Sequence, residues 1–254
     1  MKHIFVGSTQ RTKLYSEIRK SILPTRICLI AILLLLVAVP FAFHKKIFQD
    51  SVGSYCAVAY VQTYTGTGSA IHIGNNLLLS AAHVYEGMQI GDKCTIEFQD
   101  PNNATGGVKL TAEAELVALG DYYKNESPEE DFALLKVQLI DASKYAQIYS
   151  INNNLSSIRV GDDITVEGYG GGAYMQTSGK LCNITGGTTE LKNLYVADAK
   201  AWHGNSGGAL LDKNKQVIGI VIAGGILQGY NDGQTYALKI DKVINTLRSK
   251  GFQL

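Results

Sequence analysis

Short β-type runs separated by turn residues fill the chain from Ser51 onward, and they constrain the possible folds more than any other feature. Within many of these runs apolar and polar residues alternate, as in strands that bury one face. The segment Gly74-Asn75-Asn76 joins two such runs and is typical of a tight hairpin turn. We expect strands at residues 55–61, 66–73, 77–80, 93–98, 109–119, 132–137, 164–170, 179–184, 194–197, 209–211, 216–223 and 234–240.

The end of this body carries a helical pattern instead. Residues 241–250 are predicted to form a helix, with Asp241 as the N-cap and Gly251 as the C-cap. Its apolar stripe comprises Val243, Ile244 and Leu247. Many short strands followed by one terminal helix indicate an all-β body.

The N-terminal residues have a different character. Residues 1–26 form a polar, basic tail, and residues 27–43 form an uncharged apolar run at the short end of a membrane span. Six Lys and Arg precede this run and two follow it closely, which places the N-terminus in the cytoplasm by the positive-inside rule. We therefore predict a transmembrane anchor at 27–43 and a linker at 44–51. The body, residues 52–254, then lies in the periplasm or outside the cell.

A cleaved signal peptide is the alternative interpretation of this leader, and it would make the body a secreted protein. Two observations speak against cleavage. The basic region before the apolar run is long for a signal peptide, and Pro40 and Phe41 do not fit a small-residue cleavage site before Phe43.

Charge and cysteine content exclude several classes of function. The body carries more acidic than basic residues, which is not the surface of a nucleic-acid-binding protein. Its cysteines, Cys56, Cys94 and Cys182, lack metal-ligand spacing with one another or with a histidine. We expect no metal and no other cofactor, and at most one disulfide among these three cysteines.

The segment Gly204-Asn205-Ser206-Gly207-Gly208 is the strongest candidate for chemistry. Glycines let a backbone turn approach a substrate closely, and successive N–H groups on such a turn can bind a developing oxyanion. A serine hydroxyl needs a base, which in turn needs an orienting carboxylate. On its own, the segment is also compatible with a plain turn of small residues.

Two further segments supply those groups. His83 follows the apolar run 77–80 and small residues, so its imidazole is expected at the rim of a barrel, whereas His72 falls inside a strand. Asp131 directly precedes a buried-type strand, where a carboxylate can be held rigidly; Asp121 is the alternative orienter. His203 is too close to the serine along the chain to act as its base, but it can line the cleft.

Together the segments Ser80-Ala81-Ala82-His83, Asp131 to Leu135 and Gly204 to Gly208 resemble the His, Asp and Ser segments of the chymotrypsin-like serine peptidases, in the same order. Gly168-Tyr169-Gly170 also matches that family. The resemblance implies an all-β fold of two six-stranded antiparallel barrels, at about 52–145 and 155–240, with the active site between them. It implies His83 as general base, Asp131 as its orienter, Ser206 as nucleophile, and the N–H groups of Gly204 and Ser206 as the oxyanion hole.

Some residues differ from those of the family's digestive enzymes, and these differences indicate which group within the family the chain resembles more. Asn205 replaces the aspartate that pairs with a freshly cut N-terminus, so that activation switch is not expected, and Val84 replaces a disulfide cysteine. Asn205 and Asp198-Ala199 look more like the bacterial high-temperature-requirement proteases. The sequence after residue 250 is too short for the PDZ domain that those proteases carry.

The sequence therefore predicts a membrane-anchored serine endopeptidase acting on a protein or peptide substrate outside the cytoplasm. The alternatives are a catalytically silent binding module on the same fold and a hydrolase of nonpeptide substrates. By the resemblance, Lys200 occupies the floor of the specificity pocket and would favour acidic side chains, unless it points to solvent. The predicted substrate-binding residues are Lys200, Trp202, His203, Ile222, Ala223 and Gly224. The oligomeric state is left open.

Overall fold

The structure is a computed structural model that describes residues 55–100, 109–122, 127–138, 140–185, 192–227 and 230–254. The predicted tail (1–26), anchor (27–43) and linker (44–51) lie outside these residues. Within the described ranges, no helix has both the length and the apolar character needed to cross a membrane.

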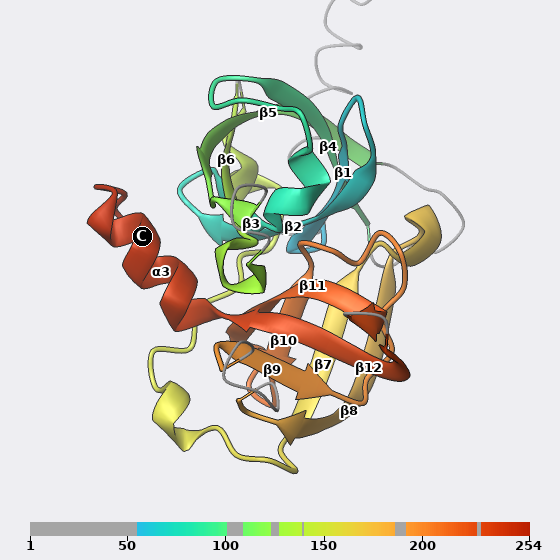
Figure 1. Cartoon of the computed structure of the whole chain (residues 1–254). Coiled ribbons are helices and arrows are strands. Elements are labelled where there is room, and N and C mark those ends of the chain that lie inside the picture. Colours follow the sequence, from blue (N-terminus) through green and yellow to red (C-terminus); the bar gives the residue numbers. More distant parts are fainter. Residues whose placement is uncertain (1–54, 101–108, 123–126, 139, 186–191, 228–229) are drawn as a thin grey trace, which may run out of the picture. The chain divides into compact units, whose positions relative to one another are not determined.

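The first half of the body forms a closed antiparallel barrel, drawn in blue to green in Figure 1, with strand order β1-β2-β3-β6-β5-β4. Its strands are β1 (Val58–Gln62), β2 (Thr67–Gly74), β3 (Leu77–Ser80), β4 (Lys93–Gln99), β5 (Lys109–Leu119) and β6 (Ala133–Val137). The predicted hairpin between β2 and β3 is confirmed. Asn75 and Asn76 have φ of 54° and 60°, as a tight turn between twisted strands requires.

The second half forms another closed antiparallel barrel, drawn in yellow to red, with strand order β10-β11-β12-β9-β8-β7. Its strands are β7 (Asp163–Gly168), β8 (Met175–Asn183), β9 (Leu194–Ala197), β10 (Ala209–Asp212), β11 (Val217–Leu227) and β12 (Tyr230–Lys239). The two barrels confirm the predicted all-β body. The strands β8, β11 and β12 run further than the alternation of their residues suggested.

Side-chain alternation explains the barrel interiors. In β4 the inward residues Cys94, Ile96 and Phe98 are buried between more exposed neighbours. All four residues of β10 are buried instead. Leu210 packs inside the second barrel, while Ala209 and Leu211 join a core that continues into the first barrel. This strand begins directly after the predicted serine turn. The C-terminal end of the turn is therefore anchored in a strand whose residues are all buried.

The terminal helix α3 (Ile240–Ser249) carries a buried stripe of residues on one face. The stripe consists of Ile240, Val243, Ile244 and Leu247. Although α3 follows the second barrel, Lys242 Nζ lies 3.6 Å from Glu130 Oε1 of the first barrel. The prediction of Asp241 as N-cap was wrong: Lys239 is the N-cap residue. Asp241 lies in the first turn, where its carboxylate faces the positive end of the helix dipole.

Candidate active site

Pairing of two strands brings His83 and Asp131 to the same end of the first barrel. Ser80, at the end of β3, lies opposite Ala133, at the start of β6. The chain then enters the short 3-10 helix η1 (Ala82–Tyr85), which carries His83. On the other strand, Asp131 follows the 3-10 helix η2 (Pro128–Glu130) and precedes β6. Antiparallel pairing therefore makes neighbours of two residues that lie 48 positions apart.

Asp131 contacts His83 at two points. Its Oδ2 lies 2.7 Å from the ring nitrogen Nδ1, and its Oδ1 accepts a hydrogen bond of 2.9 Å from the His83 backbone N–H. The carboxylate is 2% exposed, while the His83 ring is partly exposed. A proton on Nδ1 that points at Asp131 makes Nε2 the proton-accepting nitrogen of the neutral ring, which is the tautomer a general base needs.

Tyr122 adds an aromatic neighbour that the sequence patterns did not indicate. Its ring centroid lies 6.1 Å from that of His83, with the ring planes tilted by 54°. It follows Asp121, the alternative orienter, but the carboxylate bonded to Nδ1 belongs to Asp131. Only a tertiary contact, invisible in the spacing of the residues, identifies Tyr122 as part of the site.

The serine turn requires glycine at two positions. Gly204 and Gly207 have φ of +98° and +85°, a conformation that other residues adopt at a cost. A Cβ on Gly204 would lie 2.3 Å from the Tyr169 carbonyl oxygen, and one on Gly207 would lie 2.0 Å from that of Ser69. The turn is closed by the Gly208 N–H, which donates to the Asn205 carbonyl at 2.8 Å. The result leaves Ser206 partly exposed.

Two carbonyl contacts orient the peptide groups of this turn. The His203 carbonyl accepts a hydrogen bond of 2.7 Å from Gly171 N–H, and the Asn205 carbonyl accepts the one from Gly208. In a trans peptide the N–H points opposite to the C=O. The N–H groups of Gly204 and Ser206 therefore point away from these protein contacts. Within the described residues neither of them donates a hydrogen bond, so both are available to an oxyanion.

Direct contacts join the serine turn to the first barrel. The Ser206 carbonyl accepts a hydrogen bond of 2.8 Å from Ser69 N–H of β2. A Cβ on Gly207 would lie 3.0 Å from the backbone nitrogen of Ala81, two residues before His83. The turn of the second barrel thus abuts the segment that carries the imidazole.

Asn205, the second residue of this turn, is fully buried. Neither atom of its side-chain amide has a hydrogen-bond partner among the described residues. The neutral amide packs under the Gly168-Tyr169-Gly170 loop, since a Cβ on Gly170 would lie 2.9 Å from Asn205 Oδ1. The position that would hold an ion-paired aspartate in a digestive enzyme therefore holds an uncharged side chain.

The residues predicted to bind substrate flank the serine turn along the chain and on β11. Trp202 is 68% exposed, Lys200 and His203 are exposed as well, and the Lys200 carbonyl accepts a hydrogen bond from Thr177 Oγ1. Ile222 is buried, whereas Ala223 and Gly224 are partly exposed. A Cβ on Gly224 would lie 2.7 Å from Ala201 Cβ, so β11 runs close beside the segment before the serine.

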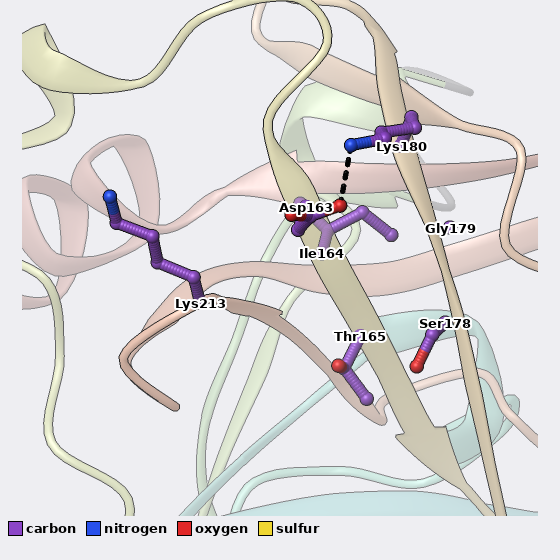
Figure 2. Close-up of a pocket in the computed structure, with 7 residues that line it drawn as sticks. All are labelled: Asp163, Ile164, Thr165, Ser178, Gly179, Lys180 and Lys213. Carbon is purple, nitrogen blue, oxygen red and sulfur yellow. Dashed lines mark hydrogen bonds and ion pairs between the residues drawn. The ribbon is translucent and has the colours of Figure 1, made fainter.

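A separate pocket lies where β7 and β8 pair, and it contains none of these residues (Figure 2). Asp163 Oδ1 and Lys180 Nζ form an exposed ion pair there at 2.6 Å. Its lining comprises Asp163, Ile164, Thr165, Ser178, Gly179, Lys180 and Lys213. Among the residues that the structure describes, no group of three or more His, Cys, Asp or Glu is placed to hold a metal ion.

Two closed barrels, an imidazole held by a buried carboxylate and a glycine-flanked serine define the class of protein. The family model of the trypsin-like peptidase domain matches residues 66–220. The chain belongs to this family and is a serine hydrolase. The predicted resemblance is confirmed.

Solved structures of bacterial proteases share this fold. The protease Rv3671c from M. tuberculosis H37Rv, in an inactive form, is 21% identical, with a TM-score of 0.56 over 77% of this chain and 89% of that chain. The HtrA-type protease AlgW with a tripeptide is 25% identical, with a TM-score of 0.58 over 80% of this chain and 62% of that chain.

Proposed function

We propose that this protein is a membrane-anchored serine endopeptidase that cleaves proteins outside the cytoplasm. The observation that carries the catalytic part is the double contact between Asp131 and His83. Beside it lies a turn whose Gly204 and Ser206 N–H groups donate no hydrogen bond within the part of the chain that the structure describes. A peptide bond is the substrate class expected of a trypsin-like peptidase domain. Both similar solved structures are described as proteases.

The proposed reaction follows from these positions. Ser206 Oγ attacks the peptide carbonyl carbon as its proton passes to His83 Nε2, and the carbonyl electron pair moves onto oxygen. The N–H groups of Gly204 and Ser206 stabilise that oxyanion. When it collapses, the C–N bond breaks and His83 gives its proton to the leaving amine. Water then repeats the sequence on the acyl-enzyme, while Asp131 stays ionised and holds the ring.

Labelling with a fluorophosphonate tests this mechanism. The full-length protein is expected to form a covalent adduct at Ser206 and to cleave casein, and Ser206→Ala and His83→Ala are expected to abolish cleavage. Ser178→Ala is the matched control, because Ser178 is exposed and lies in the separate pocket of the second barrel. Undiminished labelling and cleavage in Ser206→Ala would falsify the proposal. Absence of any labelling, with a protein substrate still captured, would favour the silent binding module.

The anchor is proposed from residues 27–43 and the basic residues before them. The full-length protein is expected to stay in the membrane fraction after alkaline carbonate extraction, with its N-terminus intact by mass spectrometry. Protease added to intact cells or spheroplasts is expected to degrade the body and spare the tail. A mature N-terminus near residue 44 would instead support the cleaved signal peptide.

The preference for acidic side chains is proposed from Lys200. A peptide library is expected to show cleavage after Asp or Glu, and Lys200→Glu is expected to reverse this preference toward Lys or Arg. Equal cleavage of acidic and neutral peptides by the unaltered protein would contradict the preference without affecting the proposed reaction.

A further inference from the structure

Ser69 of β2 lies in the first barrel yet makes hydrogen bonds on two sides of the serine turn. It is fully buried. Its backbone N–H donates to the Ser206 carbonyl at 2.8 Å, and its hydroxyl donates to the Gly204 carbonyl at 2.7 Å. These two carbonyls belong to the peptide groups on either side of the Asn205–Ser206 peptide, whose N–H is one of the two candidate oxyanion donors.

The same hydroxyl also reaches the segment that orients the other donor. Tyr169 N–H donates to Ser69 Oγ at 2.9 Å. Two residues later, Gly171 N–H holds the His203 carbonyl at 2.7 Å, and that contact turns the Gly204 N–H away from the protein. The buried Ser69 hydroxyl therefore forms hydrogen bonds both to the turn that carries the Ser206 N–H and to the loop that orients the Gly204 N–H.

From these contacts we infer that the Ser69 hydroxyl is a positioning group that holds the turn Gly204–Ser206 with both N–H groups directed at the substrate oxyanion. The inference rests on the proposed function, because it assigns Ser206 as nucleophile. Ser69 touches neither substrate nor the reacting atoms, and it acts through the backbone of the turn.

Two observations indicate that the positioning role of Ser69 depends on its hydroxyl. Without it, the Gly204 carbonyl loses its partner at a part-buried place and the Tyr169 N–H loses its partner at a buried one, which favours a turned or displaced peptide. The Asn205 side chain does not hold the turn in place of the Ser69 hydroxyl. It is uncharged, and its amide has no partner among the described residues. No ion pair of Asn205 therefore fixes this turn, unlike a turn held by a paired aspartate.

The test compares Ser69→Ala with Ser69→Thr in the full-length protein, with p-nitrophenyl acetate as the probe. Ser69→Ala keeps the backbone N–H and removes only the hydroxyl. Losing well-placed oxyanion donors costs about 10²–10³-fold in kcat, so we expect a fall of about 10²-fold in the acylation rate with a much smaller change in KM. Ser69→Thr restores a hydroxyl and is expected to recover most of the rate.

Ser80→Ala is the matched control. Ser80 is equally buried, and its hydroxyl donates to the Ser69 carbonyl at 2.7 Å. It lies beside Gly207, but among the described residues it makes no hydrogen bond to Gly204 or Tyr169. This variant is expected to lower the melting temperature about as much as Ser69→Ala does, while its acylation rate stays within about threefold of the unaltered protein. Equal losses of rate in the two variants would overturn the assignment to the Ser69 hydroxyl.

Two further readouts separate oxyanion positioning from general disruption. Phenylboronic acid forms a tetrahedral adduct with an active serine, so its inhibition constant is expected to rise at least tenfold in Ser69→Ala. The pH dependence of the acylation rate is expected to keep its midpoint, because the contact between His83 and Asp131 is untouched. A shifted midpoint with unchanged boronate affinity would overturn the inference.

The outcomes also distinguish this inference from the proposed function. If the unaltered protein reacts with neither p-nitrophenyl acetate nor a fluorophosphonate, the proposed function fails. If it reacts, Ser206→Ala does not, and Ser69→Ala acylates as fast as the unaltered protein, only the role of Ser69 fails.

Discussion

Asp131 binds both the ring and the backbone of His83, at 2.7 Å to Nδ1 and 2.9 Å to the peptide N–H. A carboxylate that contacted the ring alone would fix its tautomer but leave the ring free to move with η1. Because the second oxygen also holds the peptide, the position of the helical turn and the orientation of the imidazole are set by the same buried group. Each oxygen of Asp131 therefore has a separate task.

Replacing this carboxylate by an amide tests both tasks. In Asp131→Asn the side-chain oxygen can still accept from the peptide N–H, but the NH₂ group then faces Nδ1 and favours the wrong tautomer. We expect kcat to fall by about 10⁴-fold with little loss of fold. Steady-state kinetics with a peptide ester, together with circular dichroism, measure the two effects.

Asp121→Asn is the control for that variant, since Asp121 is the alternative orienter and is an exposed residue shortly after β5. Neutralising an exposed carboxylate changes local interactions by about 1 kcal/mol at most, so kcat is expected to stay within about tenfold. A larger loss in Asp121→Asn than in Asp131→Asn would contradict the assignment of the orienter.

Gly204→Ala is expected to disable the oxyanion turn. The added Cβ would lie 2.3 Å from the Tyr169 carbonyl oxygen at a φ of +98°, so the peptide must move. We expect a loss of about 10²–10³-fold in kcat, measured with the same ester. Gly161→Ala is the matched control, because Gly161 has a φ of +91° and nothing within 4 Å of the added Cβ. It is expected to cost about 1–2 kcal/mol of stability and no activity; comparable kinetic losses in both variants would refute the steric explanation.

Local patterns were sufficient to predict most of this fold. The alternation in residues 93–98 gave β4, and Gly74-Asn75-Asn76 gave the hairpin between β2 and β3, because each feature depends on residues close in sequence. The three segments around His83, Asp131 and Ser206 were found by their order and by the small residues around them. Each belongs to a recognisable local context, a strand end or a glycine turn.

Contacts across the fold were not predictable in this way. Ser69 lies 135 residues from Gly204, and nothing in the run Gly68-Ser69-Ala70 indicates which carbonyl its hydroxyl meets. Tyr122 likewise becomes relevant only through its ring contact with His83. The N-cap of α3 was misplaced because β12 runs directly into the helix at Lys239, without the polar break that usually separates two elements.

Acid is expected to destabilise the first barrel through His72. This side chain is fully buried in β2, with Nδ1 2.9 Å from the Gln147 carbonyl. Burial lowers the pKa of His72 below 6.5 and outweighs the opposing effects of the Gln147 carbonyl and Asp141. The unfolded chain therefore binds the proton more readily than the folded one, so stability is complete above about pH 6.5 and falls as the pH decreases.

The slope of that loss is at most one proton, or about 1.4 kcal/mol per pH unit. Urea unfolding between about pH 5 and 7.5 measures it, and His72→Gln is expected to flatten the profile by up to this amount. His203→Gln removes an exposed histidine and serves as the control. An unaltered profile in His72→Gln would exclude His72 as the source.

Tyr149→Phe is expected to destabilise the connection between the barrels. Glu167 of β7 is 2% exposed, and its Oε2 accepts a hydrogen bond of 2.5 Å from Tyr149 Oη, in the segment that joins the two barrels. Gln176 Nε2 donates to the other oxygen at 2.8 Å. Removing one donor from a buried carboxylate costs about 1–3 kcal/mol, measurable by urea unfolding at pH 7. Tyr64→Phe removes a hydroxyl from a side chain that is 67% exposed and is expected to change stability by less than about 0.5 kcal/mol.

The three described cysteines are expected to differ sharply in reactivity. Cys56, Cys94 and Cys182 are all free thiols. Burial raises the pKa of Cys56 to about 11 and that of Cys94 to about 12. Since the thiolate is the reactive form, about 10⁻³ of Cys56 and less of Cys94 is reactive at pH 8, and both side chains are shielded as well. Cys182 is partly exposed and has a pKa raised by a lesser degree of burial.

N-ethylmaleimide at pH 8, followed by peptide mass spectrometry, is therefore expected to modify Cys182 first. Cys56 and Cys94 should react at the rate of unfolding, and urea should remove the difference between the three positions. Cys182→Ser should eliminate the fast modification of the body without slowing that of the buried thiols. A disulfide-linked peptide pair, or fast modification of Cys56 or Cys94 in the folded protein, would contradict this order, because either requires the barrel around these thiols to open more readily than their burial indicates.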